Sequence, residues 1–227
     1  MHLNVLLLLL SMLLSQGSSM EIAGDLVDAG RKYSEEMDLP GEVRIISRFI
    51  EEALYSGNSI HAFNLMLRLE GLPLEEGYPD FWFARLAWSC GLAEYSSASL
   101  DRQTGSPWLR SRAAGMARQF RGEPLPAAEM FLLSMEQAVS TRQKYYSALD
   151  LSLALVGAGM FEEAEEVAMF LTSAFPREGM ARAALALSMH GQGRFGQAMS
   201  VLQSVYTDTG FSFISRDYAR SLMNDLE

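Results

Sequence analysis

The residues of this sequence that could do chemistry are few, and the first candidate is a glycine-rich run near the C-terminus. Gly191-Gln-Gly-Arg-Phe-Gly196 matches the G-x-G-x-x-G fingerprint that holds dinucleotide phosphates. That fingerprint needs a strand before it and a helix after it. Residues 181–190, which precede the run, have helical rather than strand character. We therefore interpret the motif as a turn between two helices and expect no cofactor there.

Metal ligands and nucleophiles are also scarce. The three histidines, His2, His61 and His190, are far apart, and no Cys and His spacing resembles a zinc site. The single cysteine, Cys90, lies in an apolar stretch without a neighbour that would lower its pKa, so we expect a core thiol. One cysteine cannot form an internal disulfide bond. We expect a protein that is not an enzyme and that holds no metal.

Two charged clusters could bind ions or peptides. Four glutamates within residues 162–166 fall in the first turns of an expected helix, where acids favour the helix dipole, so we interpret them as a solvated stabilising face. A basic patch over 102–121 is either a clamp for an acidic peptide, anionic lipid or glycan, or a set of ion pairs with acids on adjacent helices, which we favour. Its members crowd a segment whose only acid is Asp101: Arg102, Arg110, Arg112, Arg118 and Arg121.

Composition narrows the class of protein. The 227 residues are 49 % hydrophobic and 20 % charged, which is ordinary for a folded chain and argues against disorder. The formal net charge of -10 makes a general nucleic-acid-binding surface a poor interpretation, because phosphates would be repelled. We therefore expect a folded protein without a nucleic-acid partner.

The N-terminus has the outline of a targeting segment. The apolar run that ends at Leu14 is too short to cross a bilayer, which needs about 20 residues. Small residues suited to a cleavage site follow at 15–19. We predict a secretory signal peptide over 1–19, no membrane span, and an exported, periplasmic or extracellular protein. No Lys or Arg precedes the run, so an uncleaved anchor on the membrane surface is the alternative.

The elements that must position these residues are helices that recur at a constant step. Gly159 and Gly193 are 34 residues apart, and so are Phe161 and Phe195, and Ala164 and Ala198. A period of this length is typical of stacked helical hairpins. The predicted organisation is a signal peptide over 1–19, an N-terminal helix over 20–41, divergent helical hairpins over 42–144, two clear repeats over 145–212, and a capping helix over 213–227.

The same step can be followed towards the N-terminus. Counting back from Gly159 in steps of 34 reaches Leu125, Gly91 and Gly57. Glycine is the usual residue where a helix ends in a left-handed turn, and only Leu125 breaks the pattern. The step divides the chain into five units: 43–76, 77–110, 111–144, 145–178 and 179–212.

The pattern resembles the tetratricopeptide repeat. In the last two units a glycine separates the helices, an aromatic residue follows two positions later and alanine three after that, and Pro176 ends the unit 145–178. The match is weak over 77–144, where Ser96 and Met130 replace the alanine and Arg118 stands where a small residue is expected. The resemblance implies an all-α, right-handed solenoid of antiparallel helix hairpins, with a terminal capping helix and a concave groove lined by the first helix of each unit.

Two expected helices carry a second apolar stripe besides the face that the repeat needs for its own core. A helix that is apolar all round must be covered on both sides, so the stripe is an interface. By the resemblance it would be the groove floor; the alternative is that the C-terminal helix or a second copy of the chain covers it. The predicted partner-binding residues are Tyr146, Leu149, Leu153 and Val156 on the first helix, and Met180, Ala183, Leu187 and His190 on the second.

These observations lead to a functional expectation with two alternatives. We expect a non-catalytic adaptor or scaffold of the cell envelope or secreted space, whose partner is a protein or peptide. An apolar groove suits an amphipathic helix or an extended segment as ligand. The alternatives are a structural subunit of a homo-oligomer or larger envelope assembly, and an enzyme of unrecognised type.

Overall fold

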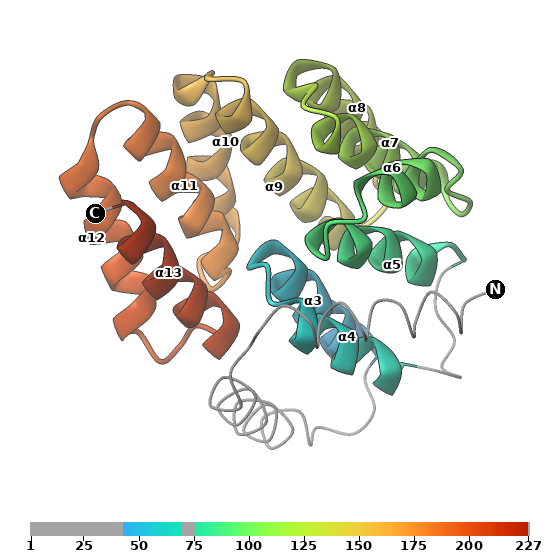
Figure 1. Cartoon of the computed structure of the whole chain (residues 1–227). Coiled ribbons are helices and arrows are strands. Elements are labelled where there is room, and N and C mark those ends of the chain that lie inside the picture. The colour runs from blue at the N-terminus through green and yellow to red at the C-terminus, as the bar shows by residue number, and fades with distance from the viewer. Residues whose placement is uncertain (1–42, 70–75, 227) are drawn as a thin grey trace. The chain divides into compact units, whose positions relative to one another are not determined.

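A computed structural model describes residues 43–69 and 76–226 and divides the chain into two compact units, Met1–Ser96 and Ser97–Glu227. Every regular element of the described residues is an α-helix (Figure 1). The signal peptide expected over 1–19 and the helix expected over 20–41 lie outside the described residues. The helices are α3 (Val43–Tyr55), α4 (Ser59–Arg68), α5 (Tyr78–Ser89), α6 (Ala93–Asp101), α7 (Pro107–Phe120), α8 (Pro124–Gln137), α9 (Thr141–Gly157), α10 (Phe161–Ala174), α11 (Gly179–Gly191), α12 (Phe195–Thr207) and α13 (Phe213–Leu226).

In unit 2 the helices form three hairpins and a terminal helix. The hairpins pair α7 with α8, α9 with α10, and α11 with α12, and the second helix of each also packs on the first helix of the next. Successive first helices, α7, α9, α11 and then α13, contact one another as well. Figure 1 shows these first helices on one side of unit 2 and α8, α10 and α12 on the other. This nearest-neighbour order confirms the all-α solenoid of helix hairpins, because each hairpin covers the next.

Unit 1 follows the same packing order. Its first hairpin pairs α3 with α4, and both helices contact α5. The side chain of Asn58 starts α4 by accepting a hydrogen bond from the backbone N–H of His61. In unit 2 the strongest start signal belongs to α9, where Ser140 and Gln143 form a reciprocal capping box.

The turn glycines show where the sequence register was right and where it was wrong. Gly57, Gly91, Gly159 and Gly193 all have a positive φ, as the left-handed turns between paired helices require. In the third hairpin this residue is Gly122, with φ +76°, whereas Leu125 lies inside α8. The steps between turn glycines are therefore 34, 31, 37 and 34 residues. A leucine could not adopt this backbone conformation without strain, so the shifted glycine sets the true register.

With Gly122 in register, the small residues that seemed absent from the third hairpin are found. Ala127, not Met130, occupies the alanine position, and it is fully buried like Ala164 and Ala198. Gly115, not Arg118, occupies the small position of the first helix. A Cβ added to Gly115 would lie 2.5 Å from the ring of Phe131, so only glycine lets that ring cross α7. The weak match over 111–144 was therefore an error of register.

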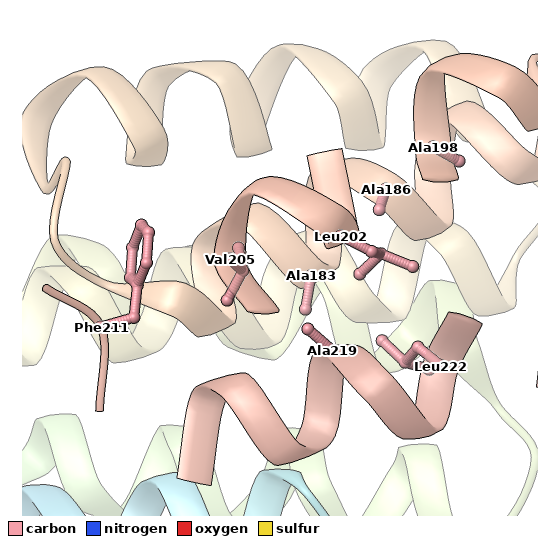
Figure 2. Packing of buried hydrophobic residues seen from close by; sticks show 8 residues of the cluster. All are labelled: Ala183, Ala186, Ala198, Leu202, Val205, Phe211, Ala219 and Leu222. Atoms are coloured by element: carbon pink, nitrogen blue, oxygen red, sulfur yellow. The ribbon is translucent and has the colours of Figure 1, made fainter. Parts of the chain in front are cut away.

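The C-terminal end of unit 2 is closed by α13, as predicted. Its buried side packs in a cluster with α11, α12 and the loop before α13, and its opposite side is polar, with Arg220, Ser221, Asn224 and Asp225 exposed. A terminal helix with a wet outer face ends a stack of hairpins without exposing its core. Figure 2 shows the eight buried members of the cluster: Ala183, Ala186, Ala198, Leu202, Val205, Phe211, Ala219 and Leu222.

We predict that enlarging the small residue at a helix crossing destabilises unit 2. Ala127→Leu and Ala164→Leu should each lower the free energy of unfolding by about 1–3 kcal/mol, because the added methyl groups overfill a closed crossing. Denaturant unfolding followed by circular dichroism measures the change. The matched control is Ala174→Leu at the exposed end of α10, which should stay within about 0.5 kcal/mol of the parent. Equal stability of Ala127→Leu and the parent would contradict the placement of Ala127 at the crossing and would favour the register that places Met130 there.

Candidate functional site

The eight predicted partner-binding residues occupy equivalent positions on α9 and α11, one 34-residue step apart. Their N-terminal members are buried in the folded chain, while those nearer the C-terminal ends of the two helices are only half-buried. The stripe is thus closed over its first part and partly open over its last. Buried are Tyr146, Leu149, Met180 and Ala183; half-buried are Leu153, Val156, Leu187 and His190.

Part of the stripe is covered by the chain's own helices. Ala183 is a member of the terminal cluster with α12 and α13, and Leu187 packs against that cluster. The alternative in which the C-terminal helix covers the stripe therefore describes these two residues. Tyr146 is held differently, because its hydroxyl accepts hydrogen bonds from Nε and Nη2 of Arg142 at 3.2 and 2.7 Å.

The half-buried members form what we call the stripe edge: Leu153, Val156, Leu187 and His190. It lies where α9 and α11, which contact each other, run into their turns. The ring of His190 packs edge-on against Phe195, with 4.9 Å between ring centres, and Phe195 is 55 % exposed. An exposed aromatic ring beside half-buried aliphatic side chains forms an apolar surface that a bound partner could cover.

The structure also contains an ion pair whose burial and acidic partner the sequence did not indicate. Nε of Arg112 on α7 donates to Oδ2 of Asp150 on α9 at 2.6 Å, and neither side chain has any exposed surface. The Arg112 guanidinium lies 5.0 Å from the ring centre of Tyr146 and 5.6 Å from that of Trp108. Nε1 of Trp108 in turn donates to the Ser147 hydroxyl at 2.8 Å. The network therefore joins two successive first helices at several points.

Unit 1 repeats this arrangement with other residues. One oxygen of Glu51 on α3 accepts from Nη1 of Arg85 on α5 at 2.5 Å, and the other accepts from Nε1 of Trp82 at 2.9 Å. The Arg85 guanidinium lies 4.5 Å from the ring centre of Tyr55. Both networks are buried, and both satisfy a charge with hydrogen bonds and aromatic rings. We assign them a structural role, because groups held in this way have no access to a substrate.

The basic patch over 102–121 is divided among separate local interactions. Besides the buried Arg112, Arg121 pairs with Asp101 at 2.9 Å and approaches Glu123 at 3.8 Å. Arg110 and Arg102 donate to the backbone carbonyls of Gly105 and Ala98. The favoured interpretation, ion pairs with acids on adjacent helices, holds for Arg112 and Arg121.

The glutamate cluster and the glycine-rich run meet at one turn. Gly193 turns α11 into α12, and Gly191 leaves room for the ring of Phe161. Arg194 Nη1 contacts both oxygens of Glu165 at 2.6 and 2.7 Å, and Gln192 donates to the same carboxylate at 2.8 Å. Burial opposes ionisation of Glu165, but these hydrogen bonds and the charge of Arg194 lower its pKa. The run is a turn that ties one hairpin to the previous one.

Two further residues that chemistry could use are placed in the core. Cys90 is buried at the end of α5, and burial raises the pKa of its thiol. His61 on α4 is also buried, and burial lowers its pKa to about 4. Among the described residues, no three His, Cys, Asp or Glu side chains are grouped as a metal ion would require. Within the same residues, no helix combines the length and apolar character that crossing a membrane takes.

We predict that breaking the buried pair of unit 2 costs far more than replacing it. Asp150→Leu removes the carboxylate that balances the buried charge of Arg112 and should lower the free energy of unfolding by about 3–5 kcal/mol. The double variant Arg112→Met with Asp150→Leu should recover most of that loss, because no charge is then stranded. Denaturant unfolding of the parent, of each single variant (Arg112→Met and Asp150→Leu) and of the double variant gives the coupling energy.

The exposed pair of Arg121 and Asp101 is the matched control for this cycle. It is largely solvated, so Arg121→Ala should change stability by less than about 1 kcal/mol. Additive effects of the two substitutions at Arg112 and Asp150 would show that the pair does not act as a unit.

We also predict an acid-sensitive local stability at α4. The unfolded chain protonates His61 near pH 6.5, whereas the folded chain does so near pH 4. The unfolded state therefore binds more protons between these values, and stability falls as the pH is lowered through that window, by at most about 3 kcal/mol. The hydrogen-exchange protection factors of residues 59–68, which correct for the intrinsic pH dependence of exchange, should fall on acidification more in the parent than in His61→Asn. A ratio of the parent's exchange rate to that of His61→Asn that is the same at pH 7 and pH 4 would contradict this prediction.

Comparison with known proteins does not assign the chain to a family. The sequence matches no protein-family model and no curated protein. Among solved structures, it is similar to the crystal structure of a Podosopora anserina kinesin light chain with nearly identical TPR-like repeats. The likeness covers 80 % of this chain and 96 % of that one, at 14 % identity and a TM-score of 0.44. The packing of its own helices gives this chain a tetratricopeptide-like helical-repeat fold.

Proposed function

We propose that the protein is a non-catalytic adaptor that holds a segment of a partner protein against the stripe edge of α9 and α11. The observation that carries the proposal is the partial exposure of Leu153, Val156 and Leu187 at equivalent positions on neighbouring first helices. A helical-repeat fold of this kind is typical of protein-interaction scaffolds. The same face offers His190 and the exposed ring of Phe195 as further contacts.

The chemistry of this face favours a particular kind of segment. Aliphatic and aromatic groups predominate, and Glu165, which contacts the turn between α11 and α12, is already paired with Arg194. An apolar or amphipathic segment would therefore gain more from docking than a strongly charged one, because burial of apolar surface drives the association. The buried members of the stripe, such as Leu149, would support the partner from below without touching it.

The proposed setting is the cell envelope or the space outside the cell. This part of the proposal depends on the apolar N-terminal run and the small residues that follow it in the sequence. An adaptor in that setting would act on exported proteins and would need no nucleotide or metal to do so.

We predict that a photo-crosslinking residue at Val156 or His190 captures a partner protein in the native cell. Both positions are half-buried on the stripe edge, so a bound segment would lie within reach. The matched control is the same crosslinker at Ser221, on the exposed side of α13. Adducts of one defined protein at positions 156 and 190, absent at 221, are the expected result, read by mass spectrometry.

The proposal also predicts the effect of a charge on the stripe edge. Leu153→Asp should reduce the adduct at Val156 without unfolding the chain, because Leu153 is only half-buried, whereas an aspartate at the buried Leu149 would disrupt the core. Adducts between two copies of the chain would instead favour the structural-subunit alternative. An adduct pattern that is the same at all three positions would reject the stripe edge as a binding surface.

A further inference from the structure

The outward faces of α8 and α10 share a pattern that the sequence register had hidden. Counted from the turn glycines Gly122 and Gly159, the tenth and eleventh residues are Leu132 and Leu133 on α8, and Met169 and Phe170 on α10. We call these four residues the outer patch. The equivalent residues of the next hairpin, on α12, are Gln203 and Ser204. The pattern therefore belongs to two neighbouring hairpins and ends at the third.

The outer patch lies on the side of each helix that the fold does not use. The buried residues of α10 are Ala164, Ala168 and Leu171, which fall on the opposite side of the helix from Met169 and Phe170. The four patch residues are between 38 % and 66 % exposed. Large apolar side chains at equivalent exposed positions mark an interaction surface better than single ones, which are common on any protein.

The charged residues of α8 and α10 are all acidic. Glu129 on α8 and Glu166 on α10 are also equivalent, seven residues after the turn glycine, and both are exposed. Each is one turn from the patch residues of its own helix, so both hairpins present a glutamate followed by a pair of large apolar residues. Exposed Glu136, Glu162 and Glu163 extend the acidic border, and neither helix contains a lysine or arginine.

We propose that the outer patch binds a cationic amphipathic segment of a partner protein. Its apolar face would cover Leu132, Leu133, Met169 and Phe170, and its lysines or arginines would lie over the glutamates at 129 and 166. Exposed methionine and phenylalanine are suited to this role, because a flexible thioether and an aromatic ring adapt to an incoming apolar face. The site is on the second helices and is separate from the stripe edge on the first helices.

Charge complementarity decides between this occupant and two others. A second copy would bring the same acidic border, in a chain of net charge -10, so like charges would oppose the contact. An anionic lipid surface would be repelled for the same reason. A basic segment gains from both parts of the patch at once, since burial of apolar area and pairing of opposite charges act in the same geometry.

The test uses a designed helical peptide of about 18 residues, with leucines on one face and lysines on the other, and a fluorescent label. Fluorescence anisotropy on the full chain measures its affinity. The parent should bind this peptide, and the double variant Met169→Ser with Phe170→Ser should bind about tenfold more weakly or worse. Glu129→Gln with Glu166→Gln should weaken binding and flatten its dependence on salt, because part of the charge attraction is removed.

Two controls match these variants. Gln203→Ala with Ser204→Ala changes the equivalent residues of α12, and should leave the affinity within about twofold. Leu153→Asp alters the stripe edge, and should also leave it unchanged, so failure of the outer patch and failure of the proposed function can be told apart. Thermal unfolding of each variant confirms that the fold survives, as expected for exposed positions.

Four outcomes would overturn the proposal. One is equal binding of a matched peptide in which glutamate replaces every lysine. Another is failure of the cationic peptide to bind the parent more tightly than the variant at Met169 and Phe170. The third is self-association of the parent that the same variant abolishes, which would assign the patch to a second copy. The fourth is binding of the parent to anionic lipid vesicles through these residues.

Discussion

The structure depends on how closely neighbouring helices can approach. Hairpins of this fold stack only if small residues stand where helices cross, because a larger side chain would hold the backbones apart. Ala127, Ala164 and Ala198 are fully buried at equivalent positions, and Gly115 gives the ring of Phe131 a place that no Cβ could share. The left-handed glycine turns complete this constraint, since they return the chain on itself within a few residues. Each hairpin can then cover its neighbour, and the terminal helix α13 covers the last.

Close packing also explains how the first helices can contain buried charges. A first helix has neighbours on several sides, so a polar group within it is removed from water. In unit 2, Arg112 pairs with Asp150 across successive first helices, and in unit 1 Arg85 pairs with Glu51 in the same way. Each buried charge is thereby compensated by one of opposite sign. Such a pair contributes little to net stability compared with apolar residues of the same size, but losing one member is costly. Because a mismatched neighbour would leave such a charge uncompensated, we infer that the pairs favour the observed arrangement of first helices.

The sequence predicted the helices well, but it predicted poorly the register of the third hairpin and the contacts that bury individual side chains. A constant step and turn glycines predicted the hairpins and the capping helix, because these features are local in the chain. The third unit was misplaced, since a short step of 31 residues is followed by a long one of 37, and the two cancel at Gly159. Arg112 was expected to pair with an acid on an adjacent helix, but neither its complete burial nor its partner Asp150 was predicted, because apolar periodicity treats every arginine as solvated. Of the predicted stripe, burial separates Leu149 and Met180 from Leu153 and Val156, a distinction that depends on tertiary contacts.

The two kinds of helix therefore give different information about partners. On a first helix, an apolar side chain can be explained by the next hairpin, as Ala183 is by α12 and α13. A second helix such as α10 has one face that none of the described hairpins covers, so packing within the described repeat does not account for its exposed apolar residues. Met169 and Phe170 are on such a face, and the equivalent residues of α12 are polar without any loss of fold. Among the described residues, α10 packs between the first helices α9 and α11, and α12 packs between α11 and α13, so each helix buries one side in the stack. The proposed partner segment accounts for the apolar residues that α10 has, and α12 lacks, on the other side.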